Sequence, residues 1–156
     1  MFFFLAVMND SPCKMRGLFG EGMLEAHQVL YVADKLIYLH NPKLAQHLEN
    51  ENIHVTMYAT QWLLTLYTSS FPFALVTRVW DCFLAEGWKV PYRVMLALLD
   101  KASPDLLKLQ FEEILGYIRE LPLKVDGEEI MEIAFKIPLR WKQIQKYAKE
   151  YAESNK

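Results

Sequence analysis

The sequence lacks the features that mark several protein classes. It contains only two cysteines, Cys13 and Cys82, and neither stands in a CxxC pair, so neither a disulfide framework nor a cysteine metal site is indicated. The net charge of −2 at pH 7 offers no basic face of the kind that nucleic-acid binding needs. We therefore discount DNA and RNA as partners and expect a cytoplasmic protein.

The chain also has no hydrophobic run long enough to cross a membrane. The opening apolar stretch, residues 1–8, carries no basic residue and is ended by Asn9 and Asp10, whereas a membrane span needs roughly 20 apolar residues. We interpret this stretch as the end of a buried helix and not as a signal peptide. A chain that begins inside an apolar helix is expected to start partway through a domain.

Catalytic and ligand-binding motifs are missing as well. The four histidines form no HExxH or Cys/His pair, and neither a phosphate-binding GxxxxGK[ST] or GxGxxG loop nor a GxSxG nucleophile motif occurs. The adjacent carboxylates at 112–113 and 128–129 point about 100° apart on a helix, which is typical of solvated faces. We expect no metal, no cofactor and no catalytic residue in this chain.

What the sequence does have is 53% hydrophobic residues, spaced for helices almost everywhere. This predicts a single all-α domain with a real core. Helix stops are indicated by Asn41-Pro42, Gly87 and Pro122. Helix starts are indicated by Pro42, by Ser103 as an N-cap with Pro104 at the first helical position, and by Asp126. The predicted helices cover 21–40, a short segment from 42, 55–68, 72–86, a segment ending near 102, two within 104–121, one after 126, and a last one from about 141.

Three segments together carry a resemblance to a known family. They are residues 58–67 (YATQWLLTLY), residues 71–72 (FP) and residues 78–87 (RVWDCFLAEG). This ordered set resembles the C-terminal half of TBC domains, and flanking segments extend the likeness over almost the whole chain. The resemblance implies a right-packed orthogonal bundle of helices that serves in a Rab GTPase-activating protein. It further implies a role in vesicle trafficking, with attachment to vesicle or organelle membranes through partners.

Four residues of this motif are interpreted as structural. Trp62 and Trp80 are large anchors at core-facing helical positions, and the helix around Trp80 is apolar nearly all round, so we expect it to lie in the core. Asp81 lies three residues after Arg78 on one helix, close enough for a charge-assisted contact with it or with a neighbouring helix. Gly87 supplies the turn that ends the helix.

Tyr58, Gln61 and Arg78 are the residues that we expect to face a partner, which the resemblance identifies as a Rab-family small GTPase. The family supplies an arginine and a glutamine in trans to the GTPase, and an arginine finger is worth roughly 10³ to 10⁵ in rate. These groups belong to IPxDxxR-like and YxQ-like motifs. No arginine in this sequence has both an isoleucine six residues before it and an aspartate three residues before it, and no tyrosine has a glutamine two residues after it. The chain is therefore expected to be a GTPase regulator, not an enzyme, and to be inactive alone.

The missing fingers leave alternatives open. Residues 1–156 are either the C-terminal piece of a TBC domain whose finger-bearing part is absent, as a fragment or a truncated gene model, or a catalytically silent helical module that binds a small GTPase or another protein. An unrelated helical adaptor is a third, weaker alternative. Because the opening run of Phe2, Phe3, Phe4, Leu5 and Val7 would pack against that absent part, we also expect self-association.

Overall fold

The structure is a computed structural model that describes residues 2–9, 13–19 and 23–156. Every regular element within these ranges is a helix, which confirms the predicted all-α fold. The elements are α1 (Phe2–Asn9), η1 (Arg16–Phe19), α2 (Leu24–His40), α3 (Pro42–Asn50), η3 (Val55–Met57), α4 (Ala59–Leu64), α5 (Phe73–Glu86), α6 (Lys89–Leu106), α7 (Phe111–Lys124), α8 (Gly127–Lys136) and α9 (Trp141–Ser154).

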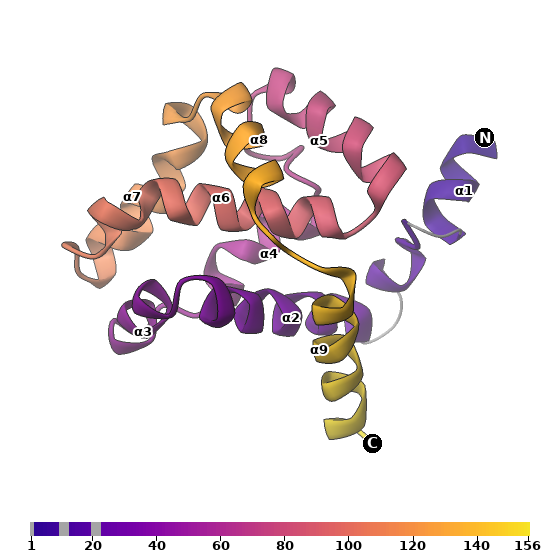
Figure 1. Ribbon diagram of the computed structural model, residues 1–156, viewed down its shortest axis with the longest axis horizontal. Helices are drawn as coiled ribbons and strands as arrows, with labels where there is room; N and C mark the ends of the chain where they lie inside the picture. Colours follow the sequence, from indigo (N-terminus) through magenta and orange to yellow (C-terminus); the bar gives the residue numbers. More distant parts are fainter. Residues whose placement is uncertain (1, 10–12, 20–22) are drawn as a thin grey trace.

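The main core is built around α6, the central helix of the bundle (Figure 1). Its side chains are buried for most of its length, and it packs against α2, α4, α5, α7 and α8. Met95, Leu98 and Leu99 are at most 1% exposed. Twelve of its 18 residues are buried, against four of 14 in α5, so α6 and not the helix predicted at 72–86 lies at the centre of the core.

A second, smaller core ties the N-terminal segment to the bundle. Val7, Cys13 and Leu18 are buried there together with Leu66 and Phe83 from the bundle itself. Figure 1 shows α1 at one edge of the molecule. The opening stretch is helical as predicted, but it is not a buried helix over its described side chains: Val7 is buried, whereas Leu5 is 47% exposed. The side chains of residues 2–4 lie outside the described part.

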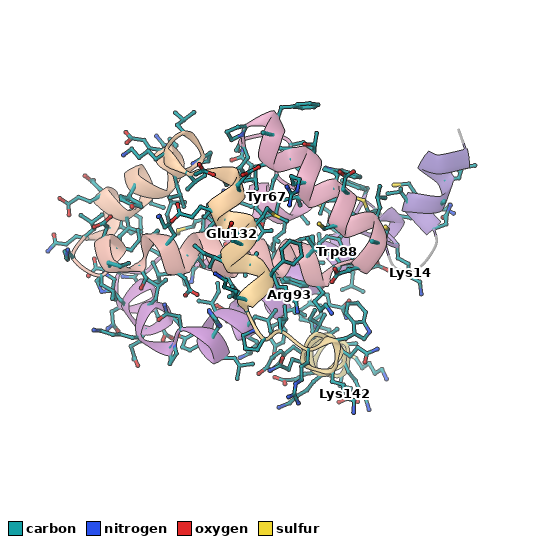
Figure 2. The ribbon with its side chains drawn as sticks, turned by 45° about the horizontal axis from the view of Figure 1, so that its top comes forward. Lys14, Tyr67, Trp88, Arg93, Glu132 and Lys142 are labelled. Carbon is teal, nitrogen blue, oxygen red and sulfur yellow. The ribbon has the colours of Figure 1, made fainter. Side chains whose placement is uncertain are left out.

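Polar contacts reinforce this N-terminal attachment. The indole N–H of Trp88 donates a hydrogen bond to the Cys13 carbonyl at 2.9 Å. Figure 2 shows Trp88 between Lys14, on the N-terminal segment, and Arg93, farther along α6. The start of α6 therefore contacts the N-terminal segment directly.

The last helix, α9, projects from the bundle beside α2 (Figure 1). The Tyr31 hydroxyl donates to Glu150 at 2.5 Å, and the Gln28 amide donates to the Ala148 carbonyl at 2.8 Å. Ile144 is its buried side chain, whereas Trp141, at the start of the helix, is 43% exposed. The predicted helix is confirmed; Trp141 borders a recess that Trp88 and Tyr92 also line, and the C-terminal end of α9 points away from the bundle (Figure 1).

Two predicted helix boundaries at prolines are wrong. Pro104 lies inside α6 and Pro122 inside α7, each within the last turn of its helix. Ser103 is not an N-cap; it is buried, and its hydroxyl contacts the Asn41 amide at 3.4 Å. Leu106, the last residue of α6, is fully buried. Burial of this last turn compensates for the hydrogen bond that a proline removes from a helix.

The predicted helix over 55–68 is also wrong in part. The chain forms η3 and the short α4, and then Leu66 and Tyr67 adopt positive φ angles of 45° and 67°. Left-handed backbone is costly for these residue types. Both side chains are fully buried, and the Tyr67 hydroxyl donates to the Pro91 carbonyl at 2.7 Å. Tertiary contacts therefore decide this turn, which periodicity cannot show.

Other local signals are confirmed. Gly87 ends α5 at a φ of 72°, in the region that favours glycine. Asn41 caps α3, with Pro42 at the first helical position, and its side chain accepts from the Leu44 amide at 3.1 Å. The Asp126 carboxylate accepts from the Glu128 and Glu129 amides at the start of α8.

Candidate functional site

The three residues expected to face a partner lie in two different environments. Tyr58 is 5% exposed, and its ring meets the Trp62 ring edge-on with centroids 5.6 Å apart. Gln61 is exposed on α4, and Arg78 is exposed on α5. The structure therefore turns Tyr58 inward and leaves Gln61 and Arg78 at the surface.

The four residues interpreted as structural also differ from one another. Trp62 is 3% exposed and packs edge-on against Phe71 as well as Tyr58. Trp80 is only half-buried; its indole N–H is buried without a hydrogen-bond partner among the described residues. Gly87 makes the turn after α5, as its φ angle shows.

Asp81 belongs to an exposed face of α5 that the sequence analysis did not anticipate. Ala74, Arg78, Asp81 and Ala85, spaced i, i+4, i+7 and i+11, are all exposed, and we call them the α5 stripe. Within the described chain, no ion pair joins Arg78 to Asp81 at 4 Å or less. The expectation that this helix is buried all round is wrong, because α6 and α8 cover only its inner side.

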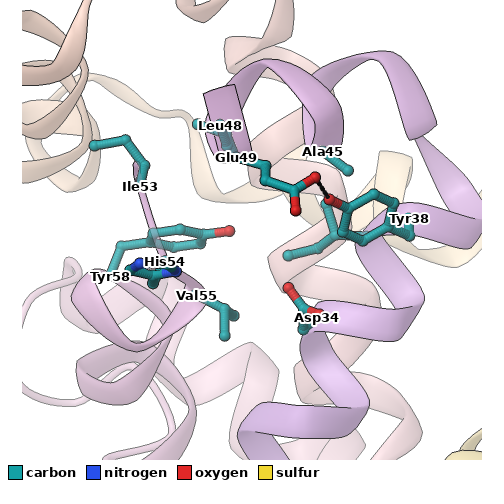
Figure 3. A pocket seen from close by; sticks show the side chains of 10 residues that line it. Asp34, Tyr38, Ala45, Leu48, Glu49, Ile53, His54, Val55 and Tyr58 are labelled. Carbon is teal, nitrogen blue, oxygen red and sulfur yellow. Dashed lines mark hydrogen bonds between the residues drawn. The ribbon is translucent and has the colours of Figure 1, made fainter. Parts of the chain in front are cut away.

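A recess lies on the inner side of Tyr58, between α2, α3 and the segment that leads into α4. We call it the α2–α3 pocket, and its volume is ≈ 180 Å³. Its polar groups come from all three segments (Figure 3). They are Asp34, Tyr38, Glu49, His54 and Tyr58. Its apolar walls are Ile37, Ala45, Leu48, Ile53 and Val55.

The electrostatics of this pocket are acidic. The Tyr38 hydroxyl donates a short hydrogen bond to Glu49, which raises the pKa of Tyr38 to about 12. Burial raises the pKa of Asp34, with Lys35 opposing the shift and Glu49 adding to it. Burial also raises the pKa of Tyr58. Sequence reasoning missed Asp34 and Tyr38, although their i, i+4 spacing on α2 places them on one helix face.

Two of the histidines link elements together. His40 Nε2 lies 2.5 Å from the Asp100 carboxylate, which joins the end of α2 to α6, and His47 Nε2 lies 3.0 Å from the Leu109 carbonyl. Among the residues the structure places, no three His, Cys, Asp or Glu side chains are grouped so that they could hold a metal ion. No helix within the described ranges is long and apolar enough to cross a membrane.

Comparison with known proteins decides the family. The family model for the Rab-GTPase-TBC domain matches residues 1–107. This chain belongs to the Rab-GTPase-TBC domain family. The resemblance carried by the motif at 58–87 is thereby confirmed for this TBC chain.

Curated relatives extend the match beyond residue 107. The human ecotropic viral integration site 5 protein homolog is 32% identical over 151 residues, which are 95% of this TBC chain and 18% of that protein. Rab GTPase-activating protein tbc-11 of Caenorhabditis elegans is 37% identical, over 88% of this chain and 15% of its own length. GTPase-activating protein GYP5 of Saccharomyces cerevisiae is 38% identical over 106 residues, which are 68% of this chain and 12% of that protein. The TBC chain thus spans less than a fifth of each of these relatives.

Proposed function

We propose that this TBC chain is the C-terminal, structural part of a GTPase-activating unit for a Rab-family small GTPase. The observation that supports this most is the family match over residues 1–107, which includes the whole motif at 58–87. The chain is then a regulator of a GTPase and not an enzyme. It acts in vesicle trafficking from the cytoplasm and reaches membranes through its partners.

The burial of the motif residues supports a division of roles. Trp62, Val79 and Phe83 are at most 3% exposed and hold the bundle together. Gln61 and Arg78 face solvent, and no described residue forms an ion pair with Arg78. On the α5 stripe this arginine stands between Ala74 and Asp81, and the small alanine leaves room for a partner surface to approach the helix. A free guanidinium on such a surface suits the acidic groups of a partner.

The catalytic groups must come from outside this sequence, since neither finger motif of the family occurs in its 156 residues. The alternative of a catalytically silent module that binds a small GTPase or another protein rests on the same observation. Both proposals assign the chain binding and not chemistry. They differ in whether a finger-bearing part, joined to it, produces GTPase activation.

The direct test uses single-turnover phosphate release from a panel of GTP-loaded Rab proteins. We expect the chain alone to leave the hydrolysis rate unchanged, and a stimulation of more than about a hundredfold, well within the range of an arginine finger, would refute the assignment. Binding is measured in parallel. Arg78→Ala is expected to weaken Rab binding, whereas Arg119→Ala, which changes another exposed arginine, on α7, serves as the matched control.

A further inference from the structure

The α2–α3 pocket holds two carboxylates that the proposed GTPase role does not use. Asp34, on α2, is half-buried and forms no ion pair within 4 Å with any residue in the described ranges. Glu49, on α3, accepts only the Tyr38 hydroxyl among the side-chain bonds found there. The two are close enough that Glu49 raises the pKa of Asp34. Asp34 is half-buried and Glu49 is exposed, and Lys35 and His54 offset the charge on Asp34 only in part, so the recess favours a cation.

Nearby positive charge does not neutralise this recess. Lys35 follows Asp34 in sequence, but its ammonium lies over the Tyr31 ring, 5.2 Å from the centroid and one turn away along α2. His54 is exposed at the rim of the pocket. Neither Lys35 nor His54 forms an ion pair within 4 Å with Asp34 or Glu49.

A second, independent feature of the same pocket is the hydroxyl of Tyr58. This side chain is 5% exposed, yet its hydroxyl forms no hydrogen bond with any described residue. Figure 3 shows it pointing into the opening that Asp34 and Glu49 also face. The hydroxyl oxygen is not among the buried polar atoms that lack a partner, so it opens into the pocket and is available to bond a ligand there.

We propose that the α2–α3 pocket binds the charged end of a basic side chain, a lysine or an arginine of a partner protein. Asp34 and Glu49 supply the counter-charge, Tyr58 supplies a hydroxyl acceptor, and the ring faces of Tyr38 and Tyr58 attract a cation. The apolar walls suit the aliphatic stem that such a side chain carries. An anionic ligand is disfavoured by both carboxylates. A bound metal ion is disfavoured because no suitable three-ligand group exists in the described chain.

The test uses the whole chain with n-butylammonium and n-butylguanidinium as probes and n-butanol as the neutral control. Methyl NMR signals of Leu48, Ile53 and Val55 report on the pocket walls. We expect both cations to shift these signals saturably and butanol to leave them in place. A response to butanol equal to that of the cations overturns the proposal, because it reports only an apolar hole.

Two substitutions test the polar groups. Asp34→Asn removes one carboxylate charge and Tyr58→Phe removes the hydroxyl while keeping the ring that packs on Trp62. Each is expected to weaken cation binding at least about tenfold, the loss that corresponds to one hydrogen bond to a charged group. Tyr117→Phe on α7 is the matched control and leaves the affinity unchanged. If Tyr58→Phe fails to fold, Asp34→Asn decides alone, and unchanged affinity in that variant overturns the proposal.

A last arm separates the source of the cation. The capped tripeptide Gly-Lys-Gly carries the lysine on a peptide, and cadaverine is a free diamine with an ammonium group at each end. Binding of the tripeptide at least as tight as that of n-butylammonium supports a partner's side chain. Binding of cadaverine without binding of the tripeptide overturns it in favour of a free amine. Because none of these arms uses a GTPase, failure here is distinct from failure of the proposed Rab function.

Discussion

Replacing Phe83 by alanine tests the second core cluster, which attaches the N-terminal segment to the bundle. Phe83 is fully buried, and its ring lies edge-on to two tryptophans, with centroid distances of 5.9 Å to Trp80 and 5.7 Å to Trp88. It also packs with Val7 and Leu18 from the N-terminal segment.

The expected cost follows from this burial. Truncating a buried phenylalanine to alanine costs about 3 to 5 kcal/mol, which includes the cavity left behind. Loss of two edge-to-face ring contacts places Phe83→Ala toward the upper part of that range, at about 4 kcal/mol. With a urea m value of about 2 kcal/mol/M, the denaturation midpoint falls by roughly 2 M.

The assay is urea denaturation followed by far-UV circular dichroism, with Phe73→Ala as the matched control. Phe73 begins the same helix but is 82% exposed, so its truncation should change the free energy of unfolding by no more than about 0.5 kcal/mol. Similar midpoints for the two variants would refute the assigned burial. An unchanged midpoint for Phe83→Ala would show that the N-terminal segment does not pack on α5.

Three further outcomes are expected. Gly87→Ala should cost about 1 to 3 kcal/mol in urea denaturation because its φ of 72° strains any other residue, whereas Gly116→Ala, in open space on α7, should gain up to about 1 kcal/mol. Because burial raises the pKa of Asp34 in the folded state, ionised Asp34 opposes folding. Asp34→Asn should therefore raise the free energy of unfolding at neutral pH, with a gain that disappears as pH falls below the ordinary value of 3.8; a gain that persists in acid would contradict this sign. Light scattering over a dilution series should show that the chain self-associates and that deletion of residues 1–8 reduces this self-association. A full chain that stays monomeric, and whose stability the deletion leaves unchanged, would contradict this expectation.

Much of the fold follows from local sequence signals. The helices at 24–40, 42–50, 73–86 and 127–136 begin or end where caps, prolines or glycine indicate, because each signal acts on its own neighbours. The ordered motif at 58–87 was sufficient to predict the family. Local chemistry and a specific motif therefore carried the correct part of the prediction.

The errors arise where distant segments decide the local structure. Leu66 and Tyr67 accept left-handed backbone because their side chains fill two cores, and α6 continues past Pro104 because Leu106 is buried. Neither burial is visible in the surrounding sequence. Composition also suggested that the helix carrying Trp80 is covered on all sides, whereas only the contacts of α5 with α6 and α8 show which side is free.

The candidate sites divide in the same way. The motif pointed to Tyr58, Gln61 and Arg78, and the structure shows which of them face solvent. The α2–α3 pocket was not predictable, because Asp34, Glu49 and Tyr58 come from three segments that only the fold brings together. Spacing on α2 could have paired Asp34 with Tyr38, but not with a carboxylate from α3.

The most direct test of the proposed role is a chimera assayed by single-turnover GTP hydrolysis. Residues 1–156 replace the corresponding C-terminal part of a TBC domain that carries both finger motifs, and the chimera is compared with the chain alone on that domain's Rab. We expect the chimera to accelerate hydrolysis by at least about 10³-fold, while the chain alone has no effect. A folded chimera without activity, or a chain that activates the GTPase unaided, would contradict the assignment of this chain as the structural part of a GTPase-activating unit.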